Sequence, residues 1–157
     1  MDMELTEIKK LLHHREPYLM VSKVTSHSKD SIESVCVHRG DEGHLRGHFP
    51  GAPVVPGAMI QEFCTQSAGI LITKYYCPVD NYDSEVTKGH ALGVLNKVEF
   101  AKYLEIVKPS HDIEAKVELL ENENNLFKFK ARVYQGGKLK AKFKFNLVNI
   151  SDSYLTE

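Results

Sequence analysis

A histidine and a glutamate suited to acid–base chemistry stand near each other in the stretch GHFPGAPVVPGAMIQEFCTQSAGILITKYY, residues 47–76. His48 lies in a segment rich in glycine and proline, whereas Glu62 lies in a run that otherwise reads as a buried helix. A carboxylate in an apolar wall costs several kcal/mol unless it is paired, neutralised or used in chemistry. We expect Glu62 to be used, together with His48, whose side-chain type titrates near neutral pH.

The element that must position Glu62 is a helix predicted over residues 57–76. Its apolar residues cover most of the circumference rather than one stripe, which is typical of a buried helix. These residues are Met59, Ile60, Phe63, Cys64, Ala68, Ile70, Leu71 and Ile72. The preceding segment, residues 40–56, holds four glycines and three prolines, and it is therefore predicted to be the structured loop that carries His48.

The second half of the chain alternates between apolar and polar residues. Three such runs, over residues 113–119, 127–134 and 139–147, predict strands that are covered on one face. The separators at residues 121–125 and 135–138 predict hairpin turns. A short helix over residues 6–12, strands over 18–27 and 31–39, and a strand over 88–100 complete the pattern. This order predicts an α+β fold with one antiparallel sheet wrapped around one long central helix, as a single domain over residues 1–157.

Composition excludes several other classes of protein. The net charge of −1 and the pI of about 6.7 give no global electrostatic case for a nucleic-acid partner. The three cysteines, Cys36, Cys64 and Cys77, have neither disulfide-framework nor zinc-knuckle spacing. The charged N-terminal segment does not resemble a signal peptide, and polar residues interrupt the long helix too often for a membrane span. We therefore expect a cytoplasmic protein with no membrane partner.

The stretches LLHHREPYLMVSKV and GHFPGAPVVPGAMIQEFCTQSAGIL carry a family resemblance. They resemble the 3-hydroxyacyl-[acyl-carrier-protein] dehydratases of bacterial fatty acid synthesis, which have the hot-dog fold. A glutamate at position 62 resembles the dehydratase-only branch rather than the branch that also isomerises the double bond. The resemblance implies a lyase that converts 3-hydroxyacyl thioesters into trans-2-enoyl thioesters in fatty acid, polyketide or polyene biosynthesis.

The resemblance also assigns roles to individual residues. His48 and Glu62 match the catalytic pair, and Gly57 matches the glycine whose amide holds the thioester carbonyl. In the family the pair is completed across a two-fold interface, which implies a homodimer or a trimer of dimers. The implied partner is an acyl carrier protein that carries the 3-hydroxyacyl chain, and no cofactor or metal is implied.

Elementary chemistry favours the same residue types independently. Removing water from a 3-hydroxyacyl thioester requires a base for the C2 proton, and an unperturbed histidine has a pKa of about 6.5. The leaving oxygen requires an acid, and a carboxyl with a raised pKa provides one. The first amide of a helix has no partner within the helix, so Gly57 N–H is available to bind the developing oxyanion.

Several residues have alternative interpretations. Phe49, Val55 and Met59 suit either an acyl tunnel or core packing, and Gln66 suits either a hydrogen bond to the site or a satisfied core position. His44 and His48 are spaced for a metal pair, but they lie in a loop and we do not favour that interpretation. The other histidines, including His14, are expected at the surface or in turns. Basic residues predicted to receive the acidic carrier protein are Lys97, Lys102, Lys108, Arg15 and Arg46.

The sequence departs from the family pattern at Ser22, where an aspartate is usual, and in the long segment 100–112, FAKYLEIVKPSHD. The latter segment and the polar loop over residues 77–87 are expected to shape the tunnel mouth. Two other functions share the fold. A hot-dog acyl thioesterase also uses a helix-borne carboxylate but has no need of His48, and a non-catalytic acyl-binding subunit needs neither residue.

Overall fold

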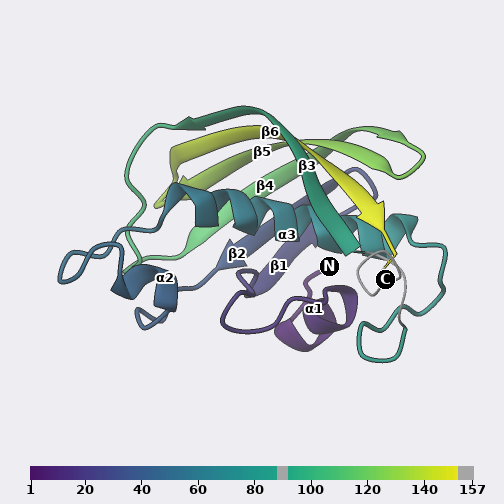
Figure 1. The fold of residues 1–157 in the computed structure, drawn as a ribbon, viewed down its shortest axis with the longest axis horizontal. Coiled ribbons are helices and arrows are strands. Elements are labelled where there is room, and N and C mark those ends of the chain that lie inside the picture. Colours follow the sequence, from purple (N-terminus) through teal and green to yellow (C-terminus); the bar gives the residue numbers. More distant parts are fainter. Residues whose placement is uncertain (88–91, 152–157) are drawn as a thin grey trace.

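The elements follow the predicted order along the chain (Figure 1). The structure is a computed structural model that describes residues 1–87 and 92–151. The helices are α1 (Leu5–Leu11), α2 (Gly43–Arg46) and α3 (Gly57–Tyr76), and the strands are β1 (Lys23–His27), β2 (Ser31–Cys36), β3 (Leu92–Tyr103), β4 (Ile113–Glu123), β5 (Leu126–Gln135) and β6 (Lys138–Ile150).

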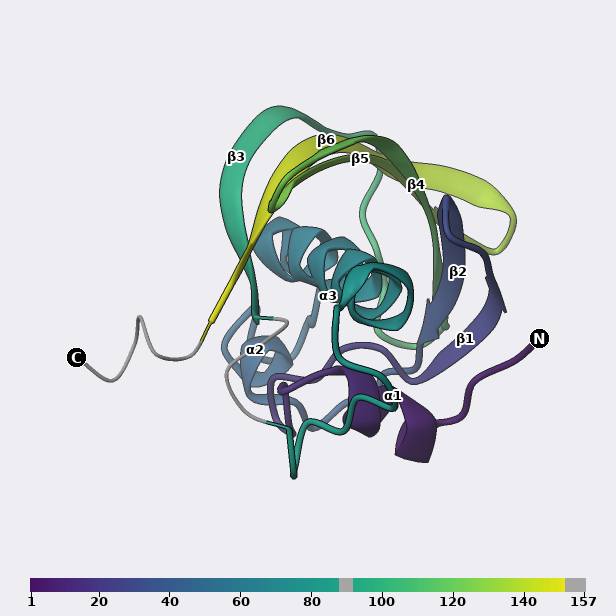
Figure 2. The same ribbon diagram turned by 90° about the vertical axis from the view of Figure 1, so that its right-hand side faces the viewer.

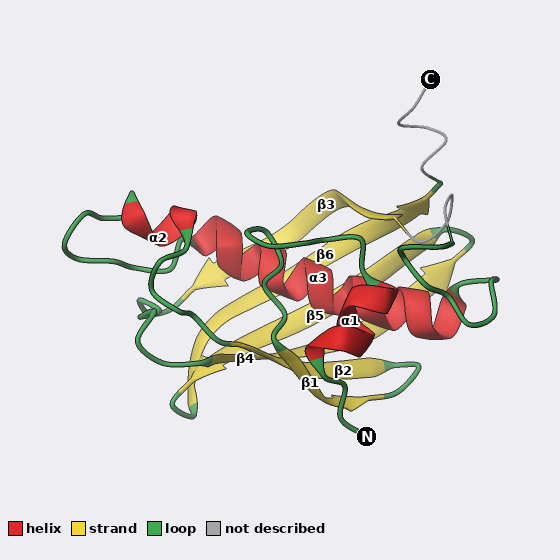
Figure 3. Cartoon of the chain, turned by 90° about the horizontal axis from the view of Figure 1, so that it is seen from below, coloured by secondary structure: helices red, strands yellow, loops and turns green. Residues whose placement is uncertain are grey.

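The described strands form a six-stranded antiparallel sheet in the order β1-β2-β4-β5-β6-β3. Figure 2, which looks along α3, shows the sheet curving around this helix. Seen from below, α1 lies across α3 and covers part of the helix that the sheet leaves open (Figure 3). The predicted α+β architecture, a sheet wrapped around one long helix, is therefore confirmed.

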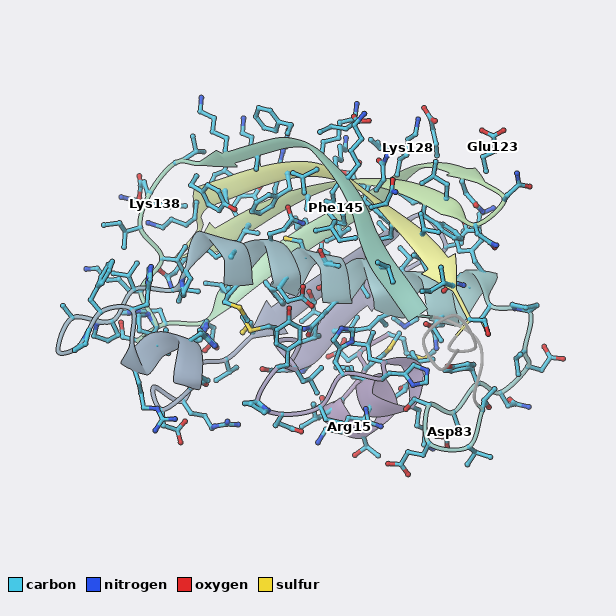
Figure 4. All side chains as sticks on the ribbon, in the orientation of Figure 1. Arg15, Asp83, Glu123, Lys128, Lys138 and Phe145 are labelled. Carbon is cyan, nitrogen blue, oxygen red and sulfur yellow. The ribbon has the colours of Figure 1, made fainter. Side chains whose placement is uncertain are left out.

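Apolar residues that alternate with polar ones along the strands form one side of the core. Ile113, Ala115 and Val117 of β4 are buried, and the residues between them are exposed. On β6, Phe143 and Phe145 point inward and are also buried. Figure 4 shows Phe145 lying between the sheet and α3, while Lys128 and Lys138 project away from the helix. Burial of one strand face against α3 supplies the hydrophobic free energy that holds the two layers together.

Helix α3 matches its predicted bounds, Gly57–Tyr76. Pro56 lies at its N-cap, and Pro78 follows two residues after its end, where it blocks continuation of the helix. Close packing against the segment after α1 depends on Gly69, because a Cβ there would lie 3.2 Å from Leu12 Cδ2. None of the described helices is long and apolar enough to cross a membrane.

The hairpin turns occur where the sequence predicts them. Gly136 and Gly137 connect β5 to β6 with φ of 57° and 75°, and Asn124 at the β4–β5 turn has φ of 56°. Two consecutive residues with positive φ match the twist of a tight hairpin, and glycine adopts this conformation without a steric cost. These turns set the register that places alternate side chains toward α3.

The structure corrects three predicted boundaries. The strand predicted over 18–27 begins only at Lys23, because the Gln66 side chain binds Tyr18 O at 2.9 Å and Met20 N at 2.7 Å, so these groups are not free to pair with a strand. The strand predicted over 31–39 ends at Cys36, and the loop over 40–56 contains the short helix α2. The strand predicted over 88–100 is observed from Leu92 to Tyr103, and residues 88–91 lie outside the described part of the chain.

Strand β3 is an edge of the sheet and carries unusual apolar exposure. Val94, Val98, Phe100 and Tyr103 are each 42–49% exposed, although they lie within a strand that pairs with β6. An edge strand offers unpaired backbone groups to another chain, and natural proteins usually protect such an edge or cover it.

Phe63 provides a test of the wrapped core. It is fully buried at the middle of the α3–sheet contact. Phe63→Ala is expected to lower the free energy of unfolding by about 3–5 kcal/mol, because it removes apolar contacts and leaves a cavity. The measurement is chemical denaturation at a fixed protein concentration.

Lys130→Ala is the control for that experiment. Lys130 Nζ lies 2.9 Å from Glu118 Oε2, and both side chains are about half exposed. Loss of such an exposed ion pair is expected to change stability by less than about 1 kcal/mol. Similar small losses for both variants would contradict the assignment of Phe63 to the core.

Candidate active site

His48 is held in a loop that closes on itself before α3. Its backbone oxygen accepts a hydrogen bond of 2.8 Å from Val54 N, and its ring Nδ1 lies 2.9 Å from Val54 O. A carbonyl oxygen only accepts hydrogen bonds, so Nδ1 carries the hydrogen in the neutral ring. The lone pair therefore lies on Nε2, which is the form of the imidazole that acts as a base.

Phe49 lies beside this base and does not enter the core. Its ring stacks on His48 with centroids 4.3 Å apart, and the residue is 57% exposed. Val55, by contrast, is buried, and its amide donates to Val107 O at 3.0 Å. Met59 is partly buried against the core cluster. The roles of Phe49, Val55 and Met59 in an acyl tunnel stay predictions.

Glu62 projects from the second turn of α3 and is largely shielded from water. Its side chain is 17% exposed, and Gln66 Nε2 donates a 3.0 Å hydrogen bond to its Oε1. Burial raises the pKa of Glu62, while hydrogen bonds from Gln66 and Tyr18 act in the opposite direction. The net upward direction favours a carboxyl that retains its proton to higher pH than an exposed glutamate does.

Gln66 joins Glu62 to the segment that precedes β1. Its Nε2 donates to both Glu62 Oε1 and Tyr18 O, and its Oε1 accepts from Met20 N. Both predicted roles for Gln66 are therefore combined, since it is buried and fully engaged while it binds the site. The clamp fixes the carboxyl group of Glu62 against a defined stretch of backbone.

His14 is a site residue that the sequence analysis missed. It was expected at the surface or in a turn, but its Nε2 lies 3.6 Å from Glu62 Oε1 and its ring stacks on Tyr18 at 6.0 Å between centroids. Burial lowers the pKa of His14, and the nearby charges of His13 and Arg15 lower it further. The available signal was its place in LLHHREP, within the stretch that carries the family resemblance.

Gly57 opens α3, and a second residue explains why glycine is needed there. A Cβ at Gly57 would lie 2.8 Å from Tyr103 Cε1, too close for two carbon atoms. The Tyr103 hydroxyl donates to Gly57 O at 3.0 Å. The amide of Gly57 belongs to the first turn, where helix geometry supplies no acceptor and the helix dipole is positive.

Within one chain the structure does not join His48 to Glu62. In residues 1–87 and 92–151, no hydrogen bond or ion pair connects the two side chains. His48 lies in the loop between α2 and α3, whereas Glu62 is clamped on the face of α3 that contacts the segment around Tyr18. The catalytic pairing of His48 and Glu62 stays a prediction, together with its completion by a second subunit.

Two other kinds of chemistry find no support. The described residues hold no group of three or more His, Cys, Asp or Glu side chains placed to bind a metal ion. Burial raises the pKa of the Cys36 thiol to about 12 and also raises that of Cys64, so neither thiol ionises near neutral pH.

A surface groove of about 810 Å³ lies between α1 and the loop after α3, away from His48 and Glu62. Its lining includes five acidic residues, Asp2, Glu4, Glu7, Asp80 and Asp83. An acyl chain requires apolar walls. The candidate site is therefore assigned from the chemistry of its residues, and this groove is not part of it.

The raised pKa of Glu62 predicts a pH-dependent stability effect. The folded state binds the proton of this carboxyl more tightly than the unfolded state, so ionisation of Glu62 destabilises the fold as pH rises from the unfolded to the folded pKa. Glu62→Gln keeps the shape and removes the ionisation. We expect it to unfold at a higher temperature than the unsubstituted protein at pH 7, with a difference that shrinks as pH falls toward 4.

Thermal unfolding across this pH range is the measurement. Glu85→Gln is the control, because the Glu85 side chain is 77% exposed. Its effect on unfolding temperature is expected to be small throughout. A Glu62→Gln protein that is less stable at pH 7 and equally destabilised at pH 4 would contradict a desolvated carboxyl.

Comparison with known proteins places the chain in a family. A family model described as "ApeI-like: ApeI dehydratase" matches residues 24–144. The protein named 3-hydroxyacyl-[acyl-carrier-protein] dehydratase FabZ from Coxiella burnetii is 33% identical over 135 residues, covering 83% of this chain and 87% of the relative. FabZ from Rickettsia bellii is 32% identical over 149 residues, covering 92% and 94%.

Solved structures support the same fold. The dehydratase heterocomplex ApeI:P from Xenorhabdus doucetiae matches with a TM-score of 0.76 at 15% identity, covering 95% of this chain and 94% of that one. A hypothetical thioesterase with coenzyme A from Streptococcus pneumoniae matches with a TM-score of 0.59 at 12% identity, covering 82% and 84%. At these identities the structural matches establish the hot-dog fold alone. The sequence matches establish more: the chain belongs to the 3-hydroxyacyl-[acyl-carrier-protein] dehydratase family.

Proposed function

We propose that this protein removes water from 3-hydroxyacyl thioesters carried by an acyl carrier protein and forms trans-2-enoyl thioesters. The observation that carries the proposal is Glu62, a shielded carboxyl with a raised pKa that Gln66 holds in one orientation. Such a group retains its proton to higher pH than an exposed carboxyl does, which suits a general acid. Family membership supplies the reaction type for which an acid of this kind is needed.

His48 acts as the base in this reaction. Its Nδ1 hydrogen is directed to Val54 O, so Nε2 is free to take the proton from C2 of the substrate. Electrons from the C2–H bond then delocalise toward the thioester oxygen and form the C2–C3 double bond as the C3 oxygen leaves. The loop contacts fix the tautomer, so no reorientation of the ring is required.

Glu62 supplies the proton to the leaving C3 oxygen, which departs as water. Its Oε1 is engaged by Gln66, and the hydrogen bond orients the carboxyl as a whole. Charge that develops on the thioester oxygen is stabilised by the amide of Gly57 at the positive end of α3. Tyr103 lies against Gly57, so its ring borders the path by which the thioester reaches that amide.

The proposed active unit is a homodimer formed through the β3 edge. Support comes from the row of half-exposed apolar residues on this strand and from the absence of a contact between His48 and Glu62 within the described residues of one chain. Two β3 strands related by a two-fold axis would pair antiparallel and cover each other's apolar side chains. A base from one subunit would then meet an acid from the other.

The proposed partner is an acyl carrier protein, which is the substrate carrier in the name of the FabZ relatives. Of the basic residues predicted to receive it, Arg15 is already engaged by Leu12 O, His14 O and the Ser84 hydroxyl. Lys102 and Lys108 are exposed on and after β3. The docking surface is therefore expected to depend on these lysines more than on Arg15.

Hydration of a crotonyl thioester, which is the reverse reaction, tests the activity. His48→Ala and Glu62→Gln are each expected to lower the rate at least about a hundredfold, because each removes a general acid–base group. The assay follows loss of the enone absorbance of crotonyl-coenzyme A with the purified full chain. Unchanged circular dichroism spectra are the check that both variants are folded.

The same assay separates the alternatives. A thioesterase would release free thiol without hydrating the enone, and an acyl-binding subunit would neither hydrate the enone nor release thiol. Near-normal hydration by either variant would contradict the roles of His48 and Glu62.

Mixing the two inactive variants tests the shared site. If each site takes His48 from one chain and Glu62 from the other, a mixed dimer contains one intact site and one site that lacks both groups. Random re-assortment of equal amounts is expected to restore roughly a quarter of the normal activity per chain. The variants are unfolded and refolded together, with each variant refolded alone as the control. No recovery in a preparation shown by mass labelling to contain mixed dimers would overturn the shared site.

A further inference from the structure

The proposed reaction leaves Glu62 without a proton after every turnover. In dehydration, the C2 proton passes to His48 and a different proton passes from Glu62 to the leaving oxygen. The catalyst is restored only when Glu62 regains a proton and His48 releases one. Since the side chain of Glu62 is only 17% exposed, exchange with bulk water is restricted, and a neighbouring group that carries protons would serve the cycle.

The groups that face Glu62 differ in their capacity to carry a proton. Gln66 and Tyr18 hydrogen-bond the carboxyl, but an amide does not titrate and a tyrosine titrates near pH 10. His14 lies with Nε2 3.6 Å from Glu62 Oε1. Among the contacts of Glu62 in the described chain, His14 is the one that titrates near neutral pH.

The position of His14 suits transfer between water and the buried carboxyl. Its side chain is 30% exposed, but Nδ1 is buried without a hydrogen-bond partner, so Nε2 is the nitrogen through which the ring exchanges protons. Stacking on Tyr18, with an interplanar angle of 16°, limits movement of the ring. The 3.6 Å separation is longer than a hydrogen bond, and such contacts are often long in proteins without substrate.

The surroundings of His14 disfavour its protonated form, so a proton that it accepts is readily released. His13 and Arg15 flank it on its own segment, Tyr18 stacks on it, and Glu62 faces it from α3. Burial together with the first two groups lowers the pKa of His14, so the ring is mostly neutral at pH 7 and a protonated ring readily gives its proton away.

We propose that His14 is a positioning residue that returns a proton to Glu62 after each turnover, an inference that rests on the proposed dehydratase activity. Nε2 of the neutral ring takes a proton from water and an N–H bond forms there. The N–H bond at Nε2 then breaks as an O–H bond forms at Glu62 Oε1, and His48 releases the C2 proton to solvent, so protons balance. The same route operates in reverse during hydration.

The test compares His14→Gln and His14→Ala with the full-length protein in crotonyl-coenzyme A hydration. Each variant is expected to lower kcat about tenfold with an unchanged KM, since the base and the thioester contacts remain. Added imidazole is expected to restore most of the kcat of His14→Ala, because it supplies a mobile proton carrier where the ring was. His27→Ala is the matched control, since His27 contacts Tyr75 near the other end of α3 and is expected to keep normal activity with no response to imidazole.

A normal kcat in both His14 variants would overturn the proposal. A loss of activity that raises KM and does not respond to imidazole would also overturn it and indicate a structural role. An unsubstituted protein that fails to hydrate the thioester would instead refute the dehydratase assignment.

Discussion

Desolvation of the Glu62 carboxyl is the constraint on which the rest of the site depends. A glutamate at this position of α3 faces a partly closed apolar environment, and burial raises its pKa. Without polar partners, such a group would either distort the helix packing or turn outward. Gln66, Tyr18 and His14 supply those partners, so the carboxyl is tolerated in a position where burial raises its pKa. The raised pKa of Glu62 therefore remains because its hydrogen bonds offset only part of the effect of burial.

The same clamp explains local features of the fold. The Gln66 side chain hydrogen-bonds Tyr18 O and Met20 N, so these groups cannot pair with a strand and β1 begins only at Lys23. The same hydrogen bonds hold the segment after α1 against α3. That segment in turn carries His14 to Glu62. At the first residue of α3, Tyr103 packs against Gly57, and the Tyr103 hydroxyl donates a hydrogen bond to Gly57 O. The amide of Gly57 remains at the start of the helix. The proposed acid, Glu62, and the proposed oxyanion donor, Gly57, are thus positioned by contacts from two different segments of the chain.

Much of this arrangement could be predicted because it follows local rules. Alternation with a period of two identified the strands, glycine pairs identified the turn at Gly136, and apolar coverage identified α3 to the residue. The motif located His48, Glu62 and Gly57, although their joint action is untested. Helix α2 was missed because four residues in a glycine-rich segment show no periodicity. His14 and Tyr103 were missed for another reason: they reach α3 through tertiary contacts, and no local pattern records which distant side chain a helix will meet.

The exposed edge of β3 links assembly to chemistry in the proposed dimer. An apolar edge strand is a liability for an isolated chain, since it invites pairing with other proteins. A second copy would remove that liability by covering Val98 and Phe100. If the second copy also supplies the base opposite Glu62, then a subunit without a partner has both an exposed β3 edge and an incomplete site. Absence of the second subunit would then leave the protein inactive and would also leave its apolar edge strand free to associate. Selection for activity would therefore maintain the interface without a separate advantage for stability.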